Sequence, residues 1–169
     1  MDCSWPQGNE GCDGGLQEWA FDYAKKHGVD TEKNYPYKGR DMSCDKTKEK
    51  EGKVKVKSYK RITPNSATSF KNGLVTSTLS VSVKADQRAF MYYKKGVVKA
   101  SSCKATSRSL DHAILAVGWD HDGTTDYAIV KNSWGTSWGE KGYIRLQIDG
   151  REGACGVLIE PLLPYTYTN

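Results

Sequence analysis

His112 opens an apolar stretch and is the residue with the clearest chemical potential in this sequence. A histidine in such a place is more often structural than catalytic, but Asp111 precedes it and Asn132 follows a second apolar stretch. An asparagine oxygen that accepts a hydrogen bond from an imidazole fixes the tautomer, and the other ring nitrogen then faces a nucleophile. A nearby indole such as Trp134 shields that hydrogen bond from water. These residues indicate the acid–base half of a nucleophilic active site.

The elements that position these side chains follow from the pattern of apolar residues. Apolar residues recur at helical spacing from Leu16 to Ala24, and Gly28 is placed to end that helix. The apolar run 112–119 is expected to form a buried strand, and Gly123 marks the turn to the next strand. A helical segment followed by a strand-rich segment predicts the α+β class. The remaining elements expected are helices near 66–75 and 89–93, strands near 54–59, 79–84, 127–131 and 142–148, and loops at 1–15 and 133–141.

Composition limits the class of protein. The chain has 169 residues, 37% apolar and 27% charged, which is typical of one soluble globular domain. No run of 18 apolar residues exists, so no membrane span is expected. The net charge is +5, and residues 46–61 hold eight basic and two acidic residues. Alternation of Lys53, Lys55 and Lys57 favours the solvated face of a strand over a nucleic-acid patch. No nucleic-acid partner is therefore expected.

The cysteines number five, so at least one thiol has no partner within the chain. Four of them can form two disulfides, which would suit an oxidising compartment. The alternative is that all five are reduced, as in a cytosolic protein. The sequence leaves the pairing open. The cysteines are Cys3, Cys12, Cys44, Cys103 and Cys155.

Four motifs stand out, at residues 110–119, 131–143, 11–15 and 34–37. In this order they resemble the histidine motif, the asparagine motif, the glycine-pair motif and a further signature of the papain-like cysteine proteases of the cathepsin L type. The resemblance implies a two-lobed α+β fold with an incomplete helical left lobe and a β-barrel-like right lobe. Residues 1–60 would form the rest of the helical lobe and the crossing segment. Residues 61–169 would form the β-rich lobe, the two together making one peptidase domain truncated at its N-terminus.

The nucleophilic cysteine is expected to be absent from this chain. In the family it lies roughly 130 to 150 residues before the histidine, which is about 18 to 38 residues before Met1. Cys3 and Cys12 lie only 109 and 100 residues before His112, and neither has a C-G-S-C-W context. Cys12 also lies in a glycine loop, whereas a helix N-terminus is where a thiol pKa is lowered. The oxyanion-hole glutamine precedes the cysteine in the family, so it is expected to be absent too.

The resemblance also implies roles for individual residues. His112 would pair with the thiolate, Asn132 would orient it, and Trp134 and Asp111 would support them. No metal or organic cofactor is needed. Cys3 with Cys44 and Cys103 with Cys155 look like two family disulfides, whereas Cys12 would stay unpaired because its partner precedes Met1. Gly14 and Gly15 would bind an extended peptide unless they form only a tight turn. A specificity pocket would be lined by Leu16, Ser82, Ala113 and Glu160, the last at its floor unless it is a surface glutamate.

Three functions are compatible with these motifs. The first is a cysteine endopeptidase seen through the C-terminal part of its catalytic domain, acting on peptides or proteins. The second is an inactive homologue that serves as a structural or protein-binding module, with a neighbouring protein covering the truncated lobe. The third is a degraded or incomplete gene product. A processed enzyme would be lysosomal, vacuolar or secreted, and a protein that natively starts at Met1 would be cytoplasmic or cytoskeletal.

Overall fold

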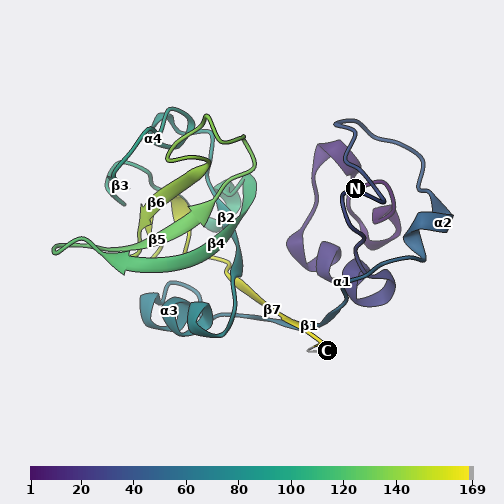
Figure 1. Ribbon diagram of the computed structural model, residues 1–169. Coiled ribbons are helices and arrows are strands. Elements are labelled where there is room, and N and C mark those ends of the chain that lie inside the picture. The colour runs from purple at the N-terminus through teal and green to yellow at the C-terminus, as the bar shows by residue number, and fades with distance from the viewer. Residues whose placement is uncertain (168–169) are drawn as a thin grey trace. The chain divides into compact units, whose positions relative to one another are not determined.

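Contacts between residues divide the chain into two units in the computed structural model, which describes residues 1–167 (Figure 1). One unit comprises Met1–Tyr59 with residues 164–167, and the other comprises Lys60–Leu163. The predicted organisation into lobes 1–60 and 61–169 stays a prediction, and residues 168–169 lie outside the described part.

The N-terminal unit is built around one helix, α1 (Gln17–His27). The Gly28 N–H donates to the carbonyl of Ala24 at 3.0 Å, with a φ of 79° that suits glycine. The last turn carries Lys25, Lys26 and His27, as the sequence predicts, where positive charge complements the helix dipole. This helix and its glycine end are therefore confirmed.

Three short helices in this unit were not predicted. Two are 3₁₀ helices inside the expected N-terminal loop, η1 (Trp5–Gln7) and η2 (Gly11–Asp13). The third is α2 (Lys46–Glu49), whose first turn is capped by the Asp45 carboxylate. A disulfide between Cys3 and Cys44 ties the start of the unit to the residue before that cap.

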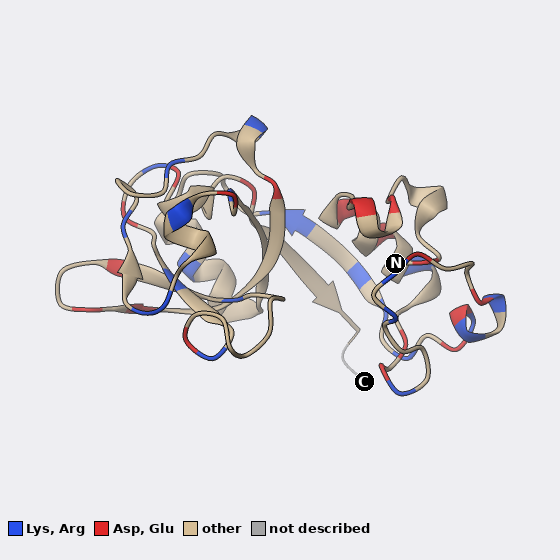
Figure 2. Cartoon of the chain, turned by 90° about the horizontal axis from the view of Figure 1, so that it is seen from above, with Lys and Arg blue, Asp and Glu red and all other residues tan. Residues whose placement is uncertain are grey.

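The lysine-rich segment forms strand β1 (Val56–Arg61) at one end of the sheet. Lys55 and Lys57 are exposed and Val56 is buried, so the alternation holds there. Val54 is 53% exposed and makes only an isolated bridge with Val29, so the strand starts two residues later than predicted. Figure 2 shows the basic residues of β1 in blue.

Seven strands form one sheet in the order β1-β7-β2-β4-β5-β6-β3. The α+β class is confirmed, and the strands form an open sheet in this order. Strands β3 and β7 were not predicted, because one has two residues and the other contains a proline. Besides β1, the strands are β2 (Leu79–Val83), β3 (Val97–Val98), β4 (His112–His121), β5 (Asp126–Lys131), β6 (Tyr143–Gln147) and β7 (Leu162–Thr166).

Antiparallel pairing brings the start of β4 beside the end of β5. On one side of β4, Val83 of β2 pairs with His112. On the other side, Leu115 pairs with Lys131, the last residue of β5. The register shifts between Ala116 and Gly118, so β4 has a bulge at Val117. The residues that follow β5 therefore lie next to the residues that begin β4.

Strand β4 is not the buried strand that its apolar run predicts. Ile114 and Ala116 are buried, but Leu115 and Val117 are each 37% exposed and Trp119 is 41% exposed. The prediction was wrong because consecutive apolar residues do not show whether both faces of a strand are covered. The face that carries Leu115 is open.

Helices and turns complete the second unit. Helix α3 (Ala67–Thr76) begins at Ser66, whose hydroxyl accepts a hydrogen bond from the Ser69 N–H, close to the predicted start. The short helix α4 (Arg88–Met91) matches the predicted helical turn. The turns η3 (Ser107–Ser109) and η4 (Ala154–Gly156) were not predicted. No helix among residues 1–167 is long and apolar enough to cross a membrane.

Candidate active site

His112 and Asn132 meet where β4 begins and β5 has just ended. The imidazole Nε2 lies 2.8 Å from the Asn132 Oδ1, and that oxygen also accepts a hydrogen bond from the Ser133 N–H at 2.8 Å. Because the backbone N–H fixes Oδ1 as the acceptor, Nε2 must be the donor in the neutral ring. The other ring nitrogen, Nδ1, is then left for a nucleophile. This is the pairing that the sequence predicts.

Two aromatic rings hold the imidazole of His112. Trp134 stacks on it, with ring centroids 5.2 Å apart and an interplanar angle of 29°. Phe90, on α4, meets it edge to face at 6.1 Å and meets Trp134 at 5.4 Å. Phe90 is fully buried and Trp134 is 41% exposed, so the first ring belongs to the core and the second to the surface. Phe90 was missed, because it lies in none of the motifs.

Trp138 ties the loop that carries Trp134 to the rest of the unit. Its ring lies 5.4 Å from Trp134 and 5.3 Å from Phe90, and its indole N–H donates to the Met91 carbonyl at 3.1 Å. The aromatic cluster of Phe90, Trp134 and Trp138 therefore joins α4 to the loop after β5. Such rings contribute through both burial and edge-to-face geometry.

A salt bridge between Glu140 and Arg145 holds the far end of the loop after β5. The Glu140 carboxylate accepts from the Arg145 guanidinium, with Nε at 2.8 Å, and from the Gly96 N–H at 3.1 Å. The hydrogen bond from Arg145 is the main cause that lowers the pKa of Glu140. Bidentate pairs of this kind hold geometry as well as charge.

Asp111, which precedes His112, makes hydrogen bonds to the backbone at the end of β2. Its N–H donates to the Val83 carbonyl at 3.0 Å, and its carboxylate accepts from the Ala85 N–H at 2.6 Å. These contacts fasten the end of β2 to the start of β4. Asp111 is thus placed to support His112 by fixing the strand on which it lies.

A cavity of about 330 Å³ borders the Asn132 side chain. Asn132 is 8% exposed, and its Nδ2 has no hydrogen-bond partner among residues 1–167. The lining residues are Ser80, Ala113, Ile114, Leu115, Lys131, Asn132 and Ser133.

The substrate residues that the resemblance implies fall in both units. Ser82 and Ala113 pair directly across β2 and β4, with Ser82 buried and Ala113 exposed. Glu160 is half-buried in the segment before β7. The residues Gly14, Gly15 and Leu16 belong to the other unit, where all three are exposed.

The two glycines differ in their surroundings. Gly14 has a φ of 106° and its carbonyl accepts from the Glu10 N–H, but a Cβ there would meet nothing within 4 Å. A Cβ on Gly15, whose φ is 152°, would lie 1.9 Å from the Asn9 Oδ1. That oxygen already accepts from the Leu16 N–H at 3.1 Å. Whether Gly15 binds an extended peptide stays a prediction.

Gly15→Ala is expected to destabilise the chain by about 1–3 kcal/mol, because the new Cβ must displace Asn9 from its hydrogen bond. Urea unfolding followed by circular dichroism measures this free energy. Gly14→Ala is the matched control, since it changes the backbone preference without a collision. Equal loss in both variants would mean that the collision with Asn9 is not the cause.

Two disulfides are present, Cys3–Cys44 and Cys103–Cys155, the pairs that the resemblance implies. Cys12 is a free thiol on the surface. Desolvation, followed by a hydrogen bond to Asp41, raises the pKa of Cys12, so its reactive thiolate form is disfavoured.

Known proteins are similar to this chain in both sequence and fold. The model of the papain family of cysteine proteases matches residues 1–165. A cathepsin L-like protein of Caenorhabditis elegans is 44% identical over 167 residues, covering 97% of this chain and 48% of that relative. Cysteine proteinase RD21A of Arabidopsis thaliana is 41% identical over 159 residues, covering 92% of this chain and 34% of that relative. The chain therefore spans between about a third and a half of the length of these relatives.

Solved structures of cysteine proteases are also similar to the fold of this chain. The Carica candamarcensis cysteine protease CMS1MS2, determined with E-64, superposes with a TM-score of 0.86 at 36% identity, covering 99% of this chain and 75% of that one. The bromelain protease of Ananas comosus, determined with the E64 inhibitor, gives a TM-score of 0.85 at 35% identity, covering 98% of this chain and 75% of that one. The chain belongs to the papain family of cysteine proteases.

Proposed function

We propose that this chain is the C-terminal part of the catalytic domain of a cysteine endopeptidase. The observation that carries the proposal is the hydrogen bond of 2.8 Å between His112 and Asn132, covered by Trp134. A buried amide that fixes one imidazole nitrogen and frees the other is the arrangement that acid–base work on a thiol requires.

The reaction is acyl transfer in two steps. A cysteine thiolate, paired with protonated His112, attacks the carbonyl carbon of the peptide bond, and the new C–S bond gives a tetrahedral intermediate. His112 then donates its proton from Nδ1 to the amine nitrogen, the C–N bond breaks, and a thioester remains. In the second step His112 takes a proton from water, the hydroxide attacks the thioester, and the thiolate leaves. Asn132 keeps the ring oriented throughout, and no metal is required.

The nucleophile is supplied from outside these 169 residues. Cys3, Cys44, Cys103 and Cys155 are bonded in pairs, and the pKa of Cys12 is raised rather than lowered. The relatives are two to three times as long as the part that this chain covers. Two disulfides favour a vacuolar, lysosomal or secreted location over the cytosol.

An epoxide thiol trap tests the proposal. The full natural protein should be labelled at one cysteine that lies N-terminal to these 169 residues, whereas the 169-residue chain alone should show no specific labelling. Intact mass and N-terminal sequencing of the natural protein locate that cysteine. A natural protein that begins at Met1 and stays unlabelled would exclude endopeptidase activity.

A specific observation favours the second candidate, an inactive homologue that binds another protein. Leu115 and Val117 are exposed apolar residues on β4, each 37% exposed. Exposed apolar residues that lie together mark an interaction surface. The labelling experiment separates the two, because only the endopeptidase reacts with the trap.

Glu160 is proposed to make the specificity pocket tolerant of a basic side chain through a carboxylate–guanidinium pair. Glu160→Ala in the complete enzyme should then lower kcat/KM about 10-fold for peptides with arginine at the second position before the cleaved bond. Matched peptides with phenylalanine there should be cleaved as before. Unchanged preference between the two peptides would place Glu160 outside the pocket.

A further inference from the structure

A cluster of metal-ligating atoms lies in the N-terminal unit. The sulfurs of Cys3 and Cys44 and a carboxylate oxygen of Glu49 all lie within 4.8 Å of one another. In the structure the two sulfurs are bonded to each other, so neither can bind a metal. We propose that reduction of this disulfide creates a site that binds one Zn²⁺ ion through Cys3, Cys44 and Glu49.

The spacing of the three atoms suits zinc. Zinc–sulfur bonds are about 2.3 Å and zinc–oxygen bonds about 2.0–2.2 Å, so tetrahedral neighbours lie about 3.3–3.8 Å apart. Breaking the sulfur–sulfur bond frees the two thiols to separate to that distance. The carboxylate of Glu49 is already within reach of both. Two thiolates and a carboxylate also leave a net charge that favours a divalent cation.

His27 lies beside Glu49 and outside the group of three ligands. Its Nδ1 lies 3.7 Å from the Glu49 Oε1, so it is an outer contact that helps to hold the carboxylate. It ends helix α1, and its ring stacks on Tyr23 at 5.0 Å with an interplanar angle of 21°. The position of the His27 ring is therefore set by its stacking on Tyr23.

Neighbouring groups already hold the ligands in place. The Glu49 side chain is 7% exposed and accepts from the Lys46 ammonium at 2.9 Å. The Tyr35 hydroxyl lies 3.8 Å from the Cys3 sulfur. Such outer contacts orient ligands and raise metal affinity.

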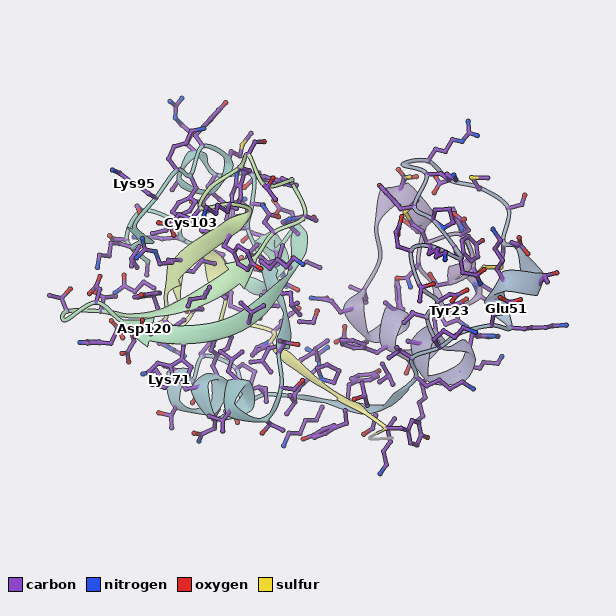
Figure 3. The ribbon with its side chains drawn as sticks, viewed as in Figure 1. Tyr23, Glu51, Lys71, Lys95, Cys103 and Asp120 are labelled. Carbon is purple, nitrogen blue, oxygen red and sulfur yellow. A yellow bond between two sulfur atoms is a disulfide. The ribbon has the colours of Figure 1, made fainter. Side chains whose placement is uncertain are left out.

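The cluster can also be reached from solvent. A cavity of about 200 Å³ in this unit is lined by residues that include Cys3, Tyr23 and Glu49. Tyr23 is labelled in Figure 3, where yellow bonds mark the disulfides. A new metal site needs such an entry path as well as correct ligands.

The chemistry balances with a dithiol as reductant. The dithiol passes two electrons and two protons to the Cys3–Cys44 disulfide and becomes a cyclic disulfide itself. Zinc then displaces the two thiol protons as it binds. The disulfide joins residues 41 positions apart, and the zinc ion would close the same loop under reducing conditions. The cross-link would thus change from covalent to metal-mediated without being lost.

The second disulfide provides an internal control. Cys103 and Cys155 are both fully buried, and the Cys103 sulfur is near the Lys84 carbonyl at 3.9 Å. No comparable group of histidine or carboxylate ligands accompanies this pair within residues 1–167. Reduction of Cys103–Cys155, with Cys103 labelled in Figure 3, should therefore create no zinc site.

The test uses the full chain with Cys12→Ser, reduced by a phosphine and titrated with Zn²⁺ against a chromophoric chelator. The reduced chain should bind one equivalent and the oxidised chain none. Glu49→Gln should weaken binding about 10–100-fold. Cys3→Ser with Cys44→Ser should abolish it, whereas Cys103→Ser with Cys155→Ser should leave it unchanged.

Circular dichroism accompanies the titration, because reduction can unfold the unit. If the reduced chain loses its spectrum, one equivalent of Zn²⁺ should restore it, as metal binding then drives folding. Failure to restore the spectrum would overturn the proposal. Equal uptake by the variant without Cys3 and Cys44 would overturn it too.

Discussion

Replacing His112 by alanine in the complete natural enzyme is expected to lower kcat/KM by about 10²–10⁴-fold, the usual worth of a positioned general acid and base. The loss should fall mainly on kcat, because the imidazole acts in the chemical steps and contributes little to substrate binding. Cleavage of a fluorogenic peptide over a range of concentrations measures both constants.

His121 offers the matched control for this experiment. It ends the same strand, its side chain is 52% exposed, and its partner is Asp126 rather than Asn132. His121→Ala should leave kcat within about twofold, as surface changes usually do. If both histidine variants lost activity equally, general damage to β4 would explain the result, and His112 would have no special role.

Phe90→Ala is expected to destabilise the chain by about 3–5 kcal/mol, the cost of truncating a fully buried aromatic ring. The ring of Phe90 contacts His112, Trp134 and Trp138, so its loss leaves a cavity beneath the stacked imidazole. Urea unfolding measures the free energy. In the complete enzyme the same variant should also lower kcat, because the ring of His112 loses one of its two supports.

Tyr92→Ala is the control for Phe90. Tyr92 follows α4 directly and is 65% exposed, so its truncation should cost less than about 1 kcal/mol. Comparable losses from both variants would mean that α4 as a whole, and not the buried ring, carries the stability. Trp134 fluorescence would report the disturbance of the cluster independently.

The pairing of His112 with Asn132 was predictable because both residues lie in long motifs. The histidine and asparagine motifs fix both the residue types and the strands that carry them. The turn at Gly123 then makes the strands antiparallel neighbours, which brings His112 to Asn132. The helix before Gly28 was predictable for a similar reason, since its spacing and its end are both local.

The parts that could not be predicted depend on contacts between distant segments. Phe90 supports the site from a helix of four residues that has no motif. Whether Leu115 and Val117 are covered depends on what lies against the sheet, and local pattern carries no such information. The neighbours of Glu49 were likewise hidden, because Cys3 and Glu49 are far apart in sequence and meet only through the fold.

The bulge at Val117 divides β4 into two halves, and each half has its own pairing register with its neighbours. The half that begins at His112 is aligned by five pairs with β2, and the half beyond Gly118 is aligned only with β5. An insertion at the turn around Gly123 can therefore shift the pairing register of the outer half. The shift would end at the bulge and leave the inner half unchanged. The hairpin tip is the place where this unit would accept an inserted peptide tag or a length change while His112 and Asn132 stay aligned.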